Sequence, residues 1–484
     1  MDLDAYRAEA EAFSSSIGRE YYLHLSGQKL ELETEAIYDE HASLFSRDAV
    51  EELRGNPSRE LLEFAVEGLI GRATEPETAE VARREATLEV AVDGERLPFR
   101  QAAVEQANEP DAERRLAIER ARLEVTMDAL NPLLREVLER SHALATELGW
   151  PSMRALCEEL SGLDLGALER ETAAFLEATE EVYEPLVEPR VRSELGLGFE
   201  ELRRADLAAF FRSPSLDDRF PAERLEGSLH ETLDGLGLEA GPRGRVRLDT
   251  EARPTKSPRA FCSPVRVPNE VYLVLAPIGG RDDYETLLHE AGHAYHYAHV
   301  DPGLPFEHRY LGDNSVTEGF AFLLESLAAD PEWLRRRLGA ADVDPVVDQS
   351  RAVELVFLRR YSAKLAYELA LHGPDAPLDA MPATYARRLS EATHVSWPEG
   401  TWLSDVDPFF YAARYLRAWA FDAELRALLL ERFGDAWFDE PAAGELLAGL
   451  WREGQRQDAA ALLEALTGRA LRFGVLLETR FSSG

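Results

Sequence analysis

The apolar residues of this chain are spaced as in amphipathic helices along most of its length. Residues 62–70 place apolar side chains at i, i+3, i+4, i+7 and i+8, behind a plausible helix cap at Ser58. A second helical stretch covers residues 111–141, where the pair Asn131-Pro132 is expected to kink or divide it. Such spacing favours a protein built mainly from packed helices.

The helical pattern is interrupted for a long stretch only after residue 240. Gly241-Pro242-Arg243-Gly244 breaks it, and residues 246–275 contain alternating and β-branched runs that predict two to four short strands. A shorter alternating run, residues 88–92, ends at Asp93-Gly94 and predicts a hairpin. The sequence therefore predicts a mainly α fold with one small sheet, and two regions: a helical region, 1–240, and a second region, 241–484.

A helix directly after the predicted sheet carries the most informative motif. Asp282 and Glu285 have the spacing of a capping box at its start, and Asp301-Pro302-Gly303 should end it. Between them lies His289-Glu290-Ala291-Gly292-His293. The sequence thus places an H-E-x-x-H pattern on a helix.

The motif has a direct chemical interpretation. His289 and His293 are one turn apart on one helix face, so both imidazoles can bind one Zn²⁺ ion. Glu290 lies beside them and can accept a proton from an attacking water. The alternative is two histidines that line an interior water. We favour the metal site.

A catalytic zinc site needs a third protein ligand and an open position. Four residues compete for this role: His299, Glu307, Asp313 and Glu318. On a continuous helix His299 points away from the other histidines. Asp313 lies in a Gly-Asp-Asn turn, and Glu307 lies in a loop that does not fix its direction.

Glu318 is the preferred candidate, although it also has a structural interpretation. Ser315 and Glu318 form a second capping-box pattern, at the start of a helix that should end near Leu327. Glu325, seven residues after Glu318, shares its helix face and could accept the free N–H of a ligating histidine. Glu325 could equally be a partly exposed salt-bridge partner.

A later helix carries two tyrosines. Asp407-Pro408 has the pattern of an N-cap and first helical residue, which places Tyr411 and Tyr415 on one face. A phenol can donate a hydrogen bond to a developing oxyanion. The alternative for each tyrosine is an aromatic core face shared with Phe410 and Trp419.

Together these segments resemble one peptidase family. Residues 286–296 resemble the H-E-x-G-H-x-x-H helix of the M3 peptidases, the family of thimet oligopeptidase and oligoendopeptidase F. Glu318 and Glu325 fall where that family has its later glutamates. The other similar segments are 255–261, 357–361, 366–368 and 410–415.

The resemblance implies a mostly helical fold with a deep substrate channel, and cleavage of short peptides. It also implies that Tyr411 or Tyr415 donates a hydrogen bond to the oxyanion. The chain departs from the family pattern in two places. Asp405 stands near the position of a family histidine, with His394 the nearest histidine upstream, and Ala413 replaces the middle tyrosine.

Composition limits the partners. The chain has 53 basic and 90 acidic residues, a net charge of −37, which disfavours nucleic acid. No apolar run is long enough for a membrane span, and the first residues have no signal-peptide pattern. The two cysteines, Cys157 and Cys262, are typical of a reducing compartment, so we expect a cytoplasmic protein. The oligomeric state is not predicted.

The sequence thus predicts a zinc-dependent endopeptidase for short peptides. His289, His293 and Glu318 would bind Zn²⁺, and Glu290 would be the general base. Residues 241–484 would form the zinc-binding catalytic region, and residues 1–240 would form part of the wall of the substrate channel. A strand near residues 271–275 could pair with the substrate backbone. Two alternatives remain open: a zinc carboxypeptidase on a similar scaffold, and a non-catalytic peptide-binding relative that retains the metal.

Overall fold

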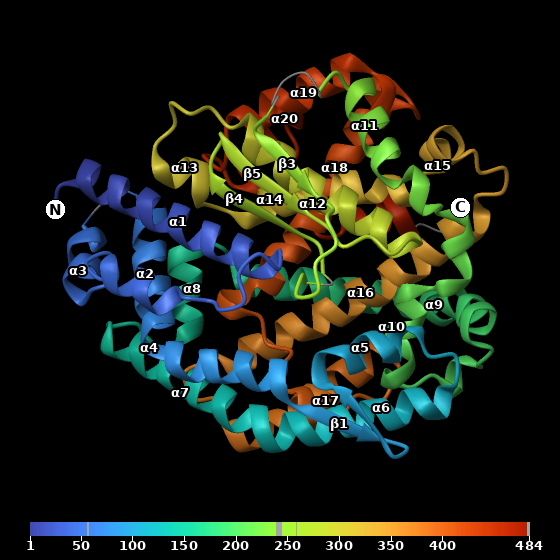
Figure 1. The fold of residues 1–484 in the computed structure, drawn as a ribbon, viewed down its shortest axis with the longest axis horizontal. Helices are drawn as coiled ribbons and strands as arrows, with labels where there is room; N and C mark the ends of the chain where they lie inside the picture. The colour runs from blue at the N-terminus through green and yellow to red at the C-terminus, as the bar shows by residue number, and fades with distance from the viewer. Residues whose placement is uncertain (56–57, 239–243, 258, 482–484) are drawn as a thin grey trace. The chain divides into compact units, whose positions relative to one another are not determined.

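The computed structural model describes residues 1–55, 58–238, 244–257 and 259–481. This described chain is mainly α-helical, with one three-stranded sheet and one two-stranded hairpin (Figure 1). The predicted fold class is therefore confirmed. The break expected at positions 241–243, and position 258 of the segment 255–261, lie outside the described residues.

The chain divides into two compact units that do not follow the order of the sequence. Unit 1 comprises Met1–Leu69, Leu216–Val347 and Arg417–Gly484, and unit 2 comprises Ile70–Ser215 and Asp348–Leu416. Three of the four borders fall inside α4 (Arg59–Thr87), α16 (Asp344–Leu371) and α18 (Tyr411–Phe433), and the fourth falls inside the 3₁₀ helix Pro214–Arg219. The functional division expected at residue 240 stays a prediction.

Unit 1 holds the three-stranded sheet and the helix with the H-E-x-x-H motif. The strands are β3 (Val246–Asp249), β4 (Phe261–Arg266) and β5 (Glu270–Val274), and the motif helix is α12 (Arg281–His299). The other helices of this unit are α1 (Leu3–Leu25), α2 (Thr34–Glu40), α3 (Arg47–Arg54), α11 (Leu225–Gly235), α13 (Phe306–Tyr310), α14 (Asn314–Glu325), α15 (Pro331–Leu338), α19 (Pro441–Arg452) and α20 (Ala459–Thr467).

Unit 2 consists of helices and the hairpin. Its elements are β1 (Glu89–Val92), β2 (Glu95–Pro98), α5 (Phe99–Asn108), α6 (Ala112–Val125), α7 (Asn131–Glu147), α8 (Met153–Ser161), α9 (Leu165–Leu195), α10 (Arg204–Arg212) and α17 (Met381–Thr393). The hairpin turn is Asp93-Gly94, both with positive φ, as predicted. A π-helical turn, Thr126–Leu130, separates α6 from α7 next to Pro132, so the expected division is also confirmed.

The sheet of unit 1 has the strand order β3-β5-β4. β3 pairs parallel with β5, and β4 pairs antiparallel with it. Every residue of β5 is buried, which explains its continuous apolar run. Because β5 has neighbours on both sides, the prediction that this strand pairs with substrate is wrong. β4 is an edge strand.

α12 lies at the centre of unit 1. It packs against β4 and β5 on one side and along α14 on another (Figure 1). The apolar side chains of α12, including Leu287, Leu288 and Ala291, join a core shared with α14, α18 and α19. The side chains of His289 and His293 contact residues of α14.

Candidate metal centre

α12 begins without the predicted capping box. Gly280, with φ 95°, is the N-cap residue and has no side chain, and the carboxylate of Asp217 accepts a hydrogen bond from the N–H of Arg281 at 3.1 Å. The carboxylate of Asp283 instead accepts hydrogen bonds from the backbone N–H groups of Ile278 and Gly279, at 2.7 and 2.6 Å. The prediction of an Asp282 cap was wrong because the direction of the entering chain, not residue spacing, decides which carboxylate reaches the backbone. The helix ends at His299, as expected.

α14 begins earlier than the sequence suggested. Asp313 is its N-cap, and its carboxylate accepts a hydrogen bond from the N–H of Ser315 at 3.0 Å. The predicted capping box between Ser315 and Glu318 does not form, because Glu318 is already inside the first turns of the helix. The Glu318 carboxylate is directed away from its own helix start and towards α12.

His289, His293 and Glu318 come together between α12 and α14. Oε2 of Glu318 lies 3.5 Å from Nε2 of each histidine, and the three potential ligand atoms lie within 4.8 Å of one another. Among the described residues, no other group of three such side chains meets this condition. Burial opposes ionisation of Glu318, but His293 and His289 together hold the pKa of this carboxyl well below its usual range.

The other ring nitrogen of His289, Nδ1, also has a partner. It lies 2.6 Å from Oε2 of Glu325, the residue that the sequence proposed as its partner. With Nδ1 donating to Glu325, Nε2 is the nitrogen of His289 that remains to bind a metal ion. A neutral imidazole in this tautomer is the form that binds a metal ion, and a His–His–Glu set is a donor set that Zn²⁺ accepts.

Glu290 lies beside this group and is held by the sheet. Its Oε2 accepts a hydrogen bond from the backbone N–H of Cys262, in edge strand β4, at 2.8 Å. Burial raises the pKa of Glu290 above its usual value, while the charges of His293 and His289 act in the opposite direction. A carboxylate with a raised pKa is suited to accept and return a proton near neutral pH.

Each rival third ligand has another role. Nδ1 of His299 lies 2.7 Å from the carbonyl oxygen of Tyr295. Glu307 pairs with Arg7 at 2.6 Å, and Asp313 caps α14. Of the four candidates, Glu318 is the residue that faces both histidines.

Sequence reasoning missed two residues next to this group. Thr317 Oγ1 lies 2.9 Å from Nδ1 of His293, and the backbone of Cys262 holds Glu290. Their position in the chain gives some indication, since Thr317 directly precedes Glu318 and Cys262 lies in β4, in the sheet that precedes α12. Residue spacing alone could not show which atoms they contact.

Tyr411 and Tyr415 belong to unit 2 and lie at the start of α18. Their rings are edge-to-face with centroids 4.9 Å apart, and the ring of Tyr361 in α16 lies 5.7 Å from that of Tyr415. Both tyrosines are only partly buried, whereas Phe410 is buried in the core. Asp407 and Pro408 are the N-cap and first residue of a short 3₁₀ helix, Pro408–Phe410, as predicted, but Phe409 and Phe410 have positive φ, so α18 itself begins only at Tyr411.

Asp405, near the expected position of a family histidine, is part of a buried ionic cluster in unit 2. It pairs with Arg360 and accepts a hydrogen bond from the hydroxyl of Tyr385 at 2.7 Å. Lys364 of the same cluster pairs with Asp407 at 2.7 Å. Asp405 thus helps to anchor the segment before α18.

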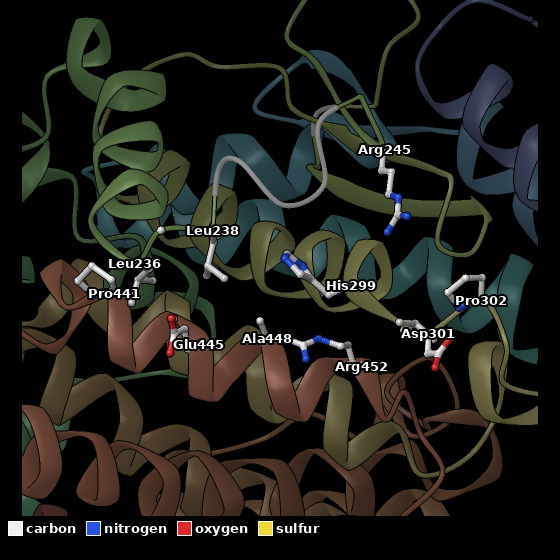
Figure 2. A pocket seen from close by; sticks show the side chains of 13 residues that line it. Leu236, Leu238, Arg245, His299, Asp301, Pro302, Pro441, Glu445, Ala448 and Arg452 are labelled. Carbon is white, nitrogen blue, oxygen red and sulfur yellow. The ribbon is translucent and has the colours of Figure 1, made fainter.

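A cavity of about 630 Å³ lies elsewhere in unit 1, at the carboxyl end of α12 (Figure 2). Its charged or polar lining groups are Arg245, His299, Asp301, Glu445 and Arg452. None of the three potential metal ligands lines it. This cavity is therefore separate from the candidate metal centre.

Comparison with known proteins supports the fold. No family model matches the chain, and no curated protein matches its sequence. Among solved structures it is similar to one described as "a putative oligoendopeptidase F from Bacillus anthracis str. Ames", with a TM-score of 0.67 and 15% identity. The match covers 97% of this chain and 88% of that one. At this identity the similarity shows the helical fold of that protein across nearly the whole chain.

The structure also bears on membrane association. None of the described helices is both long enough and apolar enough to cross a membrane.

Proposed function

We propose that this chain is a zinc-dependent endopeptidase that hydrolyses short peptides. The observation that carries the proposal is the convergence of His289, His293 and Glu318 within 4.8 Å, with Glu290 beside them. The similarity of the fold to a protein described as an oligoendopeptidase F adds support. The M3-like motif of α12 is consistent with both.

His289, His293 and Glu318 would hold the ion. Bound zinc would supply a Lewis acid that polarises the scissile carbonyl and lowers the pKa of the attacking water towards ~7. Glu290 accepts the proton of that water and transfers it to the leaving amine as the peptide bond breaks. The N–H of Cys262 restrains one Glu290 oxygen, so the other oxygen is available for this transfer.

Tyr411 and Tyr415 are proposed as donors to the oxyanion that forms on the substrate carbonyl. A phenol is neutral at physiological pH and donates one hydrogen bond, so it can stabilise the developing charge. Because both tyrosines are only partly buried, a substrate can reach either side chain.

The test is the substitution Glu290→Gln. Glutamine keeps the side-chain shape and can still accept the hydrogen bond from Cys262, but it cannot accept the water proton. We expect a zinc content equal to that of the wild type and a loss of peptide hydrolysis. The matched control is Glu464→Gln, an exposed glutamate of α20. If Glu290→Gln retained full activity, the proposed mechanism would be wrong.

The choice of substrate separates the two alternatives. An internally quenched peptide with a blocked carboxyl end is cut by an endopeptidase but not by a carboxypeptidase. Zinc bound at one ion per chain, with no turnover of any member of a peptide library, would identify a non-catalytic binding protein.

A further inference from the structure

Thr317 lies directly behind one of the proposed zinc ligands. It precedes Glu318 in α14 and its side chain is 2% exposed. Its Oγ1 lies 2.9 Å from Nδ1 of His293. When Nε2 of His293 binds a metal ion, Nδ1 carries the proton and donates a hydrogen bond to the threonine oxygen. Thr317 thus contacts Nδ1 of His293, just as Glu325 contacts Nδ1 of His289.

The same hydroxyl has a second partner on α12. The phenol of Tyr297, one turn after His293, forms a side-chain hydrogen bond with Thr317. A hydroxyl can accept from one group while it donates to another. Thr317 can therefore accept from His293 while it donates to the oxygen of Tyr297.

Three other buried threonines bond within their own helix. Thr179, Thr232 and Thr393 each donate to the carbonyl oxygen four residues earlier, and each also accepts from a side chain, as Thr232 does from Trp333 of α15. A bond to the carbonyl four residues earlier is the usual way for a helical threonine to satisfy its hydroxyl. Thr317 lies next to His293 of α12, and its hydroxyl is therefore placed at a histidine of the candidate metal centre.

Close packing of the two helices allows this reach. A Cβ atom at Gly292 would lie 2.5 Å from Cα of Ala321 and 2.6 Å from the carbonyl oxygen of Phe320. The backbones of α12 and α14 are therefore in direct contact beside His293. At this separation a side chain as short as threonine can touch the imidazole.

We propose that Thr317 is a positioning residue for the metal site, and that it holds His293 in the ring orientation and tautomer needed for zinc binding. This inference rests on the proposed function, since it requires that His293 binds zinc. Groups that hold the second nitrogen of a ligating histidine commonly contribute ~10–100-fold to metal affinity. We expect a contribution of this size from the Thr317 hydroxyl.

The experiment compares Thr317→Val with Thr317→Ser. Valine keeps the shape and removes the hydroxyl, whereas serine keeps the hydroxyl. Zinc affinity is measured by competition with a chromophoric chelator, and the visible absorption of the Co²⁺ form reports the ligand geometry. Thr467→Val is the control, because the Thr467 hydroxyl donates to Leu463 within its own helix.

We expect Thr317→Val to weaken zinc binding ~10–100-fold and to alter the Co²⁺ spectrum. Thr317→Ser should remain close to the wild type, as should Thr467→Val. Thermal unfolding without metal checks that Thr317→Val still folds. If it does not fold, Tyr297→Phe replaces it, and this variant should weaken binding by a smaller factor, because the hydroxyl then loses only its acceptor.

Three outcomes would overturn the inference: equal zinc affinity for Thr317→Val and wild type, equal losses for valine and serine, or no effect of Tyr297→Phe where it replaces valine. The second outcome would mean that packing, not the hydroxyl, holds His293. A wild-type chain that binds no zinc at this site would instead refute the proposed function itself, so the two failures are distinguishable.

Discussion

At the scale of single residues, the segment before Tyr411 is unusual. Phe409 and Phe410 both adopt positive φ, of 50° and 56°. For residues other than glycine this conformation costs of the order of 1–2 kcal/mol each. Asp407 holds the segment from α16, because its carboxylate pairs with Lys364 and its N–H donates to Glu368 at 2.9 Å. These two contacts of Asp407 hold the backbone that leads into α18, and they help to offset the cost of the two positive φ angles.

Tyr411 and Tyr415, at the start of α18 after this segment, can be tested for the proposed oxyanion role. Replacing each by phenylalanine should separate a catalytic phenol from a packing ring. The variant that loses the oxyanion donor should lose ~10²–10³-fold in kcat with little change in KM. Steady-state kinetics on a quenched peptide measures both constants, with Tyr21→Phe, an exposed tyrosine of α1, as control. Full kcat in both variants would exclude the proposed role.

At the scale of elements, the contact between α12 and α14 determines the site. His289 and His293 lie on α12, and Glu318 lies on α14. Their atoms converge only if the two helices approach closely, and Gly292 permits that approach because a side chain there would collide with backbone atoms. The glycine of the motif therefore has a packing role distinct from the chemistry of its neighbours.

The prediction at this scale is Gly292→Ala. Because backbone cannot move aside as a flexible side chain can, the added methyl should destabilise the fold by about 1–3 kcal/mol or more, and it should also weaken zinc binding. Denaturant unfolding measures the first effect and chelator competition the second. The control is Gly449→Ala in α19, where a Cβ meets nothing within 4 Å and better helix propensity should stabilise by about 0.5–1 kcal/mol. A Gly292→Ala variant as stable as wild type would contradict the packing argument.

At the scale of the whole molecule, charge is the dominant feature. With a net charge of −37, the carboxylates on the surface repel one another. Many arginines pair locally with carboxylates. Arg115 and Asp206 form a fully buried pair at 2.8 Å, while pairs such as Arg83 with Glu80 are more exposed and each contributes little. Local pairing leaves the excess of negative charge in place.

We therefore expect added salt to stabilise the protein. At low ionic strength the Debye length is ~30 Å, which falls to ~8 Å at physiological ionic strength and screens the repulsion between distant carboxylates. The melting temperature should rise between 10 mM and 200 mM KCl at constant pH and fixed zinc occupancy. Sucrose at equal osmolality is the control for effects other than screening. A melting temperature that falls with KCl would mean that local ion pairs outweigh the net repulsion.

Local sequence patterns predicted which helices and strands form better than they predicted the residues at which the helices begin. The hairpin at Asp93-Gly94, the division next to Pro132 and the strands between residues 246 and 275 were all recognisable from period and turn residues. The caps at Asp282 and Ser315 were predicted wrongly, because several polar residues near a helix start compete for the same N–H groups. Which of them wins depends on the path of the preceding chain.

By itself, the sequence determined the helical class and placed two histidines and a glutamate on one helix. Both follow from a fixed helical period, which acts within a few residues. Only the tertiary structure decided that Glu318 faces the histidines while Glu307 pairs with Arg7, and that Thr317 meets His293. These choices depend on the separation and rotation of packed elements. Side chains far apart along the chain meet across such contacts, and no local period encodes them.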